Sequence, residues 1–154
     1  MNLNKQFADT VTKIAAKFSE LAGMPFIQMR GGPSHSAKPG IYVIYDGRSA
    51  VHVGRTRNLR KRLQGHCSES HYHASFAFKR ARAQTGIMAD YKVGNSRSKL
   101  AADAAFRPAF LEQVAAIRMM EYRFLEVPNP IEQYLLELYT AMELGISLDE
   151  FDTH

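Results

Sequence analysis

The chain has 154 residues, of which 45% are hydrophobic and 23% charged, and its formal net charge is +5. This length and composition predict one globular domain with a single core. No apolar run approaches the roughly 20 residues that a membrane span needs, so we expect no membrane partner.

The cysteine content limits the cross-links that can stabilise the chain. Cys67 is the single cysteine, which excludes an internal disulfide and a zinc site built from several cysteines. The first residues also lack the basic-then-apolar order of a secretory signal. Together these features predict a reducing, cytoplasmic location. His66, His71 and His73 lie close together, but they lack the paired spacing that is typical of zinc ligands.

Positive charge is concentrated in the middle of the chain, which favours an anionic partner such as nucleic acid. The basic residues form two groups, Arg55, Arg57, Arg60, Lys61 and Arg62 in the first and Lys79, Arg80 and Arg82 in the second. Acidic residues gather toward the C-terminal end. A solvated helix surface explains either basic group equally well, so charge alone does not decide between the two interpretations.

An amphipathic pattern opens the chain. Apolar residues recur at helical spacing from Leu3 to Leu21 and predict a packing helix within residues 1–24. A connector rich in glycine, serine and proline follows. Two runs of β-branched and aromatic residues then flank an Asp46-Gly47 turn signal. They predict antiparallel strands over residues 40–45 and 50–53.

A basic helix is predicted directly after the second strand. The pattern over residues 59–66 places Leu59 and Leu63 on one face and Arg62 and His66 on another, one turn apart. A guanidinium group binds phosphate oxygens bidentately. Arg62 and His66 could therefore both reach one phosphate.

The remainder of the chain is predicted to hold helices and one further strand. Helical patterns cover residues 74–84, 100–114 (interrupted at Pro108) and 130–144, and a polar turn is predicted over 94–99. The apolar residues expected to be buried on the last helix are Ile131, Tyr134, Leu135, Leu138 and Met142. Alternation over residues 117–127 predicts a third strand. The expected fold is thus α/β of the α+β type, a small three-stranded antiparallel sheet flanked by helices.

Two blocks of this sequence resemble the GIY-YIG nuclease superfamily. Gly40-Ile41-Tyr42 repeats the first half of the motif, and His52-Val53-Gly54 stands where the second half, Tyr-Ile-Gly, is expected. The segment up to His66 resembles the family's basic Asn-Leu-Arg-Leu-His stretch. Residues 128–144, which include Glu132, resemble the helix that carries the family's metal-binding glutamate.

This resemblance implies a fold and a reaction. Residues 1–154 would form one nuclease domain, in which 40–66 supply the motif hairpin and basic helix, 67–116 a helical insertion, and 117–144 the third strand and the glutamate helix. Members cut DNA by in-line attack of water on a phosphate, with one divalent ion, Mg²⁺ or Mn²⁺. The implied partner is double-stranded or branched DNA. A homodimer would allow cuts in both strands.

The resemblance also implies roles for individual residues. The implied catalytic residues are Tyr42, His52, Arg62, His66 and Glu132. Tyr42 would hold or deprotonate the attacking water, Arg62 would neutralise the phosphate with support from His66, and Glu132 would bind the metal ion. The expected nucleic-acid contacts are Arg55, Arg57, Lys61, Lys79, Arg80 and Arg82.

Three alternatives stay open. His52 replaces a tyrosine, and because the ordinary pKa values of imidazole and phenol are about 6.5 and 10, either Tyr42 or His52 could be the general base. Glu132 follows Asn129 and Pro130 in a capping-box pattern that needs no metal. A non-catalytic nucleic-acid-binding module that retains the scaffold is the alternative function. A purely structural domain is a third possible function.

Overall fold

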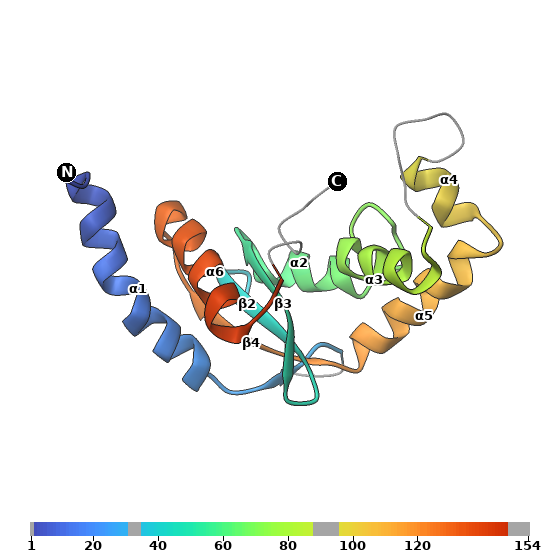
Figure 1. Cartoon of the computed structure of the whole chain (residues 1–154). Helices are drawn as coiled ribbons and strands as arrows, with labels where there is room; N and C mark the ends of the chain where they lie inside the picture. The colour runs from blue at the N-terminus through green and yellow to red at the C-terminus, as the bar shows by residue number, and fades with distance from the viewer. Residues whose placement is uncertain (1, 31–34, 88–95, 148–154) are drawn as a thin grey trace.

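The computed structural model describes residues 2–30, 35–87 and 96–147. Helices and strands follow one another along the chain as Figure 1 shows. The elements are α1 (Lys5–Gly23), β1 (Ile27–Gln28), β2 (Gly40–Asp46), β3 (Ser49–Thr56), α2 (Leu59–His66), α3 (Ser75–Thr85), α4 (Arg97–Ala102), α5 (Phe106–Arg118), β4 (Glu121–Glu126) and α6 (Pro130–Leu144).

The strands form one antiparallel sheet in the order β1-β4-β2-β3, which places β3 at an edge. The hairpin of β2 and β3 is formed as predicted, with Tyr42 opposite Gly54. The predicted fold class, an antiparallel sheet flanked by helices, is confirmed. The sheet has four described strands instead of three, because the two-residue β1 pairs with β4. Two residues are too few to produce an alternating pattern.

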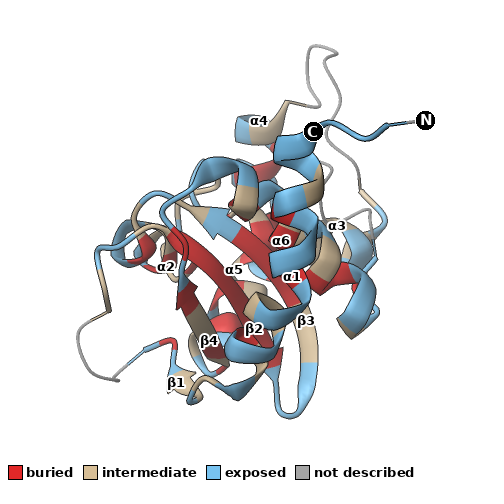
Figure 2. Ribbon diagram, turned by 90° about the vertical axis from the view of Figure 1, so that its left-hand side faces the viewer, coloured by how far each residue is buried: buried red, intermediate tan, exposed pale blue. Residues whose placement is uncertain are grey.

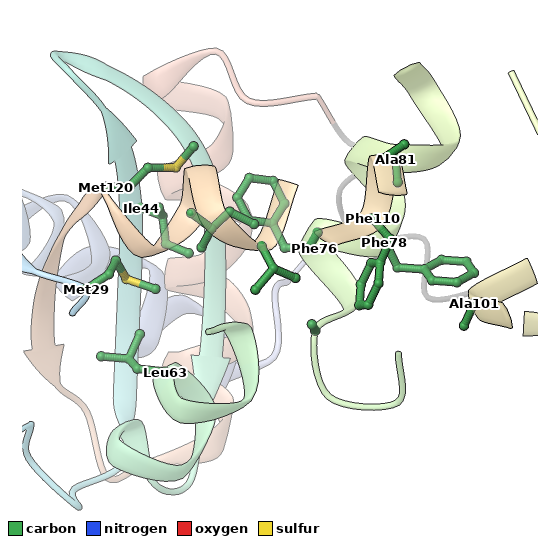
Figure 3. Packing of buried hydrophobic residues seen from close by; sticks show 14 of the residues in the cluster. Met29, Ile44, Leu63, Phe76, Phe78, Ala81, Ala101, Phe110 and Met120 are labelled. Atoms are coloured by element: carbon green, nitrogen blue, oxygen red, sulfur yellow. The ribbon is translucent and has the colours of Figure 1, made fainter. Parts of the chain in front are cut away.

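Alternate residues of β2 point to opposite faces of the sheet and build two separate cores. Tyr42 and Ile44 pack with side chains of α2, α3 and α5, part of which Figure 3 shows. Ile41 and Val43 pack with α1 and α6. β2 is therefore buried on both faces, as its colour in Figure 2 indicates. This double packing fixes the strand that carries Tyr42.

Two predicted elements differ from the structure in their limits. The helix predicted over 100–114 is divided into α4 and α5, and the break falls at Asp103, whose carboxylate accepts two backbone N–H groups at the start of α5. Pro108 lies in the first turn of α5, where its missing N–H costs nothing. Because α5 continues to Arg118, the last strand is shorter than predicted.

The face that α6 buries also differs from the prediction. Four residues expected inside are exposed, Ile131, Tyr134, Leu138 and Met142. The buried residues are Gln133, Leu136, Thr140 and Ala141. The helix therefore packs through a more polar stripe than its hydrophobic pattern indicates.

Part of the sequence lies outside the described residues. The turn predicted over 94–99 is described only from residue 96, and the acidic end only up to residue 147. Within the described ranges, the structure contains no helix with the length and apolar character that crossing a bilayer requires.

Candidate active site

Four of the predicted site residues meet where β2, β3 and α2 come together. Tyr42 comes from β2, His52 from β3, and Arg62 and His66 from α2. Asn58 begins α2, because its side-chain oxygen accepts a backbone N–H of the first turn. The helix thus starts directly after β3 and presents Arg62 and His66, one turn apart, to Tyr42.

The Tyr42 hydroxyl is the centre of this group. Arg62 Nε donates a hydrogen bond to it at 3.0 Å, and His66 Nε2 lies 2.8 Å away. His52 Nε2 is 3.4 Å away, which is long for a hydrogen bond. A guanidinium group can only donate, so the hydroxyl accepts from Arg62, and it donates its own proton to His66 in the neutral tautomer that carries hydrogen on Nδ1.

Burial determines the protonation states of the centre. Burial raises the pKa of Tyr42, a change that Arg62 opposes and the charge of Glu137 reinforces. Burial also lowers the pKa of His66 well below its usual 6.5, and the fields of His52 and Arg62 add to this effect. At neutral pH the centre therefore contains a neutral phenol and a neutral imidazole.

Helix α3 closes one side of the site. Its Phe76 stacks on the His52 ring, with centroids 4.6 Å apart and planes inclined by 27°. Its Ser75 hydroxyl accepts a hydrogen bond from Arg62 Nη2 at 3.3 Å. Sequence reasoning missed both residues, because nothing in the pattern of α3 indicates which neighbour its first turn meets.

The two motif glycines make room for different groups. A Cβ at Gly54 would overlap the hydroxyl and ring of Tyr42, so its absence lets the tyrosine cross the edge strand. A Cβ at Gly40 would overlap the Leu125 carbonyl oxygen of β4 instead. Gly54 therefore shapes the site, whereas Gly40 allows the sheet to pair closely.

Helix α6 carries three glutamates, and two of them, Glu132 and Glu137, point in different directions. Glu132 Oε2 lies 3.3 Å from Lys17 Nζ of α1, and Glu137 Oε2 lies 3.3 Å from Arg55 Nε of β3. Five residues at 3.6 per turn separate the two side chains by about 140° around the helix. The structure thus brings Glu137 to the edge strand, while the contacts of Glu132 are with α1.

Glu137, which contacts Arg55, interacts electrostatically with the Tyr42 centre. Burial raises the pKa of Glu137, against the lowering effects of Arg55 and Arg62. Glu137 in turn contributes to the raised pKa of Tyr42. Sequence reasoning missed Glu137. The signal that could have found it is a carboxylate within the stripe of α6 that is otherwise buried.

The predicted nucleic-acid contacts of the first basic group fall into two sets. Arg57 and Lys61 are exposed and line a pocket that also contains Arg62 and His73. Arg55 is engaged by Glu137 and lies over the Tyr134 ring, 3.8 Å from its centroid. The pocket beside Arg62 is therefore the cationic surface that adjoins the Tyr42 centre.

The second basic group packs against the helical part of the molecule. Arg80 Nε donates to Gln113 Oε1 at 2.7 Å, and the Arg82 guanidinium lies 5.7 Å from the centroid of Phe78. Lys79 is half-buried. Their role in binding nucleic acid stays a prediction.

In the part of the chain that the structure describes, no three or more His, Cys, Asp or Glu side chains are grouped so as to hold a metal ion by themselves. The three-histidine arrangement considered for zinc is therefore not formed there. His66 is instead fully buried against the Tyr42 hydroxyl.

Comparison with known proteins identifies one family. Residues 38–104 match the model of the family described as the GIY-YIG catalytic domain. This range includes β2, β3, α2 and α3, and thus Tyr42, His52, Arg62 and His66. It ends before α6, which carries Glu137. No curated protein and no solved structure matches the chain at a significant level.

Proposed function

We propose that this chain, whose residues 38–104 match the GIY-YIG catalytic domain, is a metal-dependent DNA endonuclease with Tyr42, Arg62, His66 and Glu137 at its active centre. The family is typical of endonucleases that act on DNA and generally use divalent metal ions. The observation that carries the proposal is the Tyr42 hydroxyl, held by Arg62 and His66 at the sheet edge that Glu137 approaches from the other face.

The carboxylate at Glu137 fits a hard divalent ion such as Mg²⁺ or Mn²⁺. Mg²⁺ is commonly held by one or two carboxylates and keeps several of its waters, so a single half-buried glutamate beside a phosphate site suits it. The resemblance implied Glu132, and both glutamates form an ion pair at 3.3 Å, but that of Glu132 is with Lys17 of α1 whereas that of Glu137 is with Arg55 of the edge strand. We therefore propose Glu137 for this role. When bound, the ion would supply positive charge to the phosphate oxygens.

Arg62 has hydrogen-bond donors left for a phosphate. A guanidinium group carries five N–H donors, of which Nε is used on Tyr42 and one on Ser75. The remaining donors lie beside the pocket that Arg57 and Lys61 line. Arg62 can therefore stabilise charge that develops on the phosphate, while Tyr42 keeps it in place.

Tyr42 orients the attacking water in this proposal. With His66 in the tautomer that carries hydrogen on Nδ1, the hydroxyl donates to His66 and accepts from Arg62, which leaves one lone pair for a hydrogen bond from water. Because the pKa of His66 is low, its imidazole is a weak base. His66 therefore orients the Tyr42 hydroxyl without removing its proton. His52, stacked on Phe76, supports Tyr42 from the other side.

A plasmid-nicking assay tests this function. Wild-type protein with Mg²⁺ or Mn²⁺ should convert supercoiled DNA to the nicked form, and EDTA should prevent it. Arg62→Ala should lower the rate by about 100-fold or more. Arg60→Ala is the matched control on the same helix. Arg60 Nε donates to the backbone oxygen of His35 and not to the Tyr42 hydroxyl, so this variant should retain activity.

The alternative is a non-catalytic nucleic-acid-binding module. It is favoured by His52, which stands in the second half-motif and is 7% exposed, packed on Phe76 like a core residue. If wild-type protein binds DNA but fails to cut it whichever divalent ion is added, that result would support this alternative and overturn the endonuclease. Double-stranded or branched DNA, a homodimer and a cytoplasmic location stay predictions.

A further inference from the structure

A second group of cationic side chains gathers on the helical part of the molecule. We call it the Arg97 cluster: His71 before α3, Arg97 at the start of α4, and Arg107 in the first turn of α5. Arg97 Nε donates to the His71 carbonyl oxygen at 2.7 Å. The Arg97 guanidinium lies 4.4 Å from the centroid of Phe78, whose place among the buried helical side chains Figure 3 shows.

Two nitrogen atoms of the Arg97 cluster are buried and have no hydrogen-bond partner in the part of the chain that the structure describes. Among the described residues, nothing accepts a hydrogen bond from Arg97 Nη2, and nothing bonds His71 Nε2. Buried polar groups in native proteins are almost always paired. These two atoms therefore indicate a partner other than the described residues.

Among the described residues, the Arg97 cluster also has no neutralising carboxylate. No ion pair involves His71, Arg97 or Arg107 in the described parts of the chain. Burial lowers the pKa of His71, and the fields of Arg97 and Arg107 lower it further. Burial also lowers the pKa of Arg97, and the charge of Arg82 lowers it further. Each positive group thus disfavours the charged form of the others, and an anion between them would relieve this repulsion.

We propose that the Arg97 cluster binds a phosphate group. The fork of a guanidinium matches two phosphate oxygens, and Arg97 still has a buried donor to offer. Arg107 is exposed and uses Nη1 on the Ala101 carbonyl oxygen, which leaves its other donors available. His71 Nε2 supplies a third donor when it carries a proton.

The position of the cluster relates it to the DNA site. His71 lies two residues before His73, which lines the pocket beside Arg62, so their Cα atoms are at most about 7 Å apart. A strand that enters that pocket can continue to the Arg97 cluster. On the proposed function, from which this part of the inference follows, the group is a backbone phosphate outside the cleaved bond. Free inorganic phosphate is the other source of the same chemistry.

DNA affinity without cleavage tests the first source. The dissociation constant for a fluorescent duplex is measured by anisotropy in EDTA for wild-type protein and the double variant Arg97→Gln/Arg107→Gln. We expect the dissociation constant of the double variant to be about 10-fold higher. The slope of log affinity against log salt concentration should fall by the amount that corresponds to about one phosphate contact or more. Lys99→Gln, which removes an exposed cation from the same short helix, is the control and should change affinity by less than about 2-fold.

Thermal unfolding with inorganic phosphate at constant ionic strength tests the second source. Phosphate should raise the melting temperature of wild-type protein and not that of the double variant. A phosphate response without any change in duplex affinity would overturn the DNA source and support free phosphate. Equal duplex affinity and equal phosphate response in both proteins would overturn the site.

Two controls keep the result decisive. If the double variant does not fold by circular dichroism, Arg107→Gln alone decides, because its side chain is exposed. Wild-type protein that fails to cut DNA overturns the proposed function, whereas the phosphate measurement still decides whether the Arg97 cluster is a phosphate site.

Discussion

The two faces of β2 contribute to the site in different ways, although one strand builds both. On one face Tyr42 holds a polar centre inside an otherwise apolar core of α2, α3 and α5. On the other face, the apolar side chains of Ile41 and Val43 pack against α1 and α6. Glu137 comes from that second face, where it contacts Arg55 of the edge strand β3, and its charge raises the pKa of Tyr42 across that strand.

This difference separates two kinds of requirement. The Tyr42 centre depends on residues of adjoining elements, so local changes should disrupt it directly. The carboxylate depends on how α6 packs on the sheet, so its position is a property of the tertiary fold. Substitutions on each side of β2 should therefore affect catalysis and stability to different extents.

Tyr42→Phe should have the largest effect on activity. Without the hydroxyl, Arg62 Nε and His66 Nε2 lose their shared partner, and the attacking water loses its contact. We expect the cleavage rate to fall by about 10²–10³-fold, with a stability loss of about 1–3 kcal/mol from unpaired buried groups. Single-turnover cleavage and urea unfolding measure the two effects. Wild-type cleavage by the variant would contradict the role of the hydroxyl.

Gly40→Ala should mainly reduce stability. Its Cβ would overlap the Leu125 carbonyl oxygen, and that backbone cannot move without disturbing the pairing of β2 with β4. We expect a loss of about 3 kcal/mol in the free energy of unfolding. Chemical denaturation measures it, and a variant as stable as the wild type would show that the strands can separate at little cost.

Gly54→Ala should cost less stability but more activity. The added methyl group would displace the Tyr42 ring, a buried side chain, without meeting the backbone of another strand. We expect about 1–2 kcal/mol of destabilisation together with a clear loss of cleavage at temperatures where the variant is folded. The contrast with Gly40→Ala is the test: if both variants lose activity only in proportion to unfolding, Gly54 has no special role in the site.

His66→Gln should remove a pH dependence of stability. Because the pKa of His66 in the folded protein lies well below 6.5, its contribution is fully present above about pH 6.5 and is lost as the pH falls below that value. One such group changes the free energy of unfolding by at most about 1.4 kcal/mol per pH unit. Urea unfolding between pH 7 and pH 5 should show a flatter dependence in the variant. Parallel curves would mean that His66 titrates normally.

The part of the site that could be predicted from the sequence is the part built by local interactions. Strand alternation and the Asp46-Gly47 turn determine the hairpin, and Asn58 begins α2 just after it. The spacing of Arg62 and His66 then follows from helix geometry. These features need no knowledge of distant contacts, which explains why they are visible in the pattern.

The carboxylate could not be predicted in the same way. The hydrophobic pattern of α6 indicates a buried face at Leu138 and Met142, yet the helix packs through Gln133 and Thr140. Glu132 also carries a strong local signal as a first-turn residue after Asn129, which attracts attention to it. Which face of α6 meets β3 depends on α1 and the sheet together, and this information is not local.

Cleavage by two glutamine variants of α6 tests the central claim most directly. Glu137→Gln keeps an oxygen for Arg55 but loses the charge that a divalent ion needs, and Glu132→Gln makes the same change beside Lys17. With Mg²⁺, we predict that Glu137→Gln lowers the cleavage rate on the order of 100-fold and that Glu132→Gln cleaves nearly as wild type. Loss of cleavage in Glu132→Gln, with Glu137→Gln unaffected, would contradict the account.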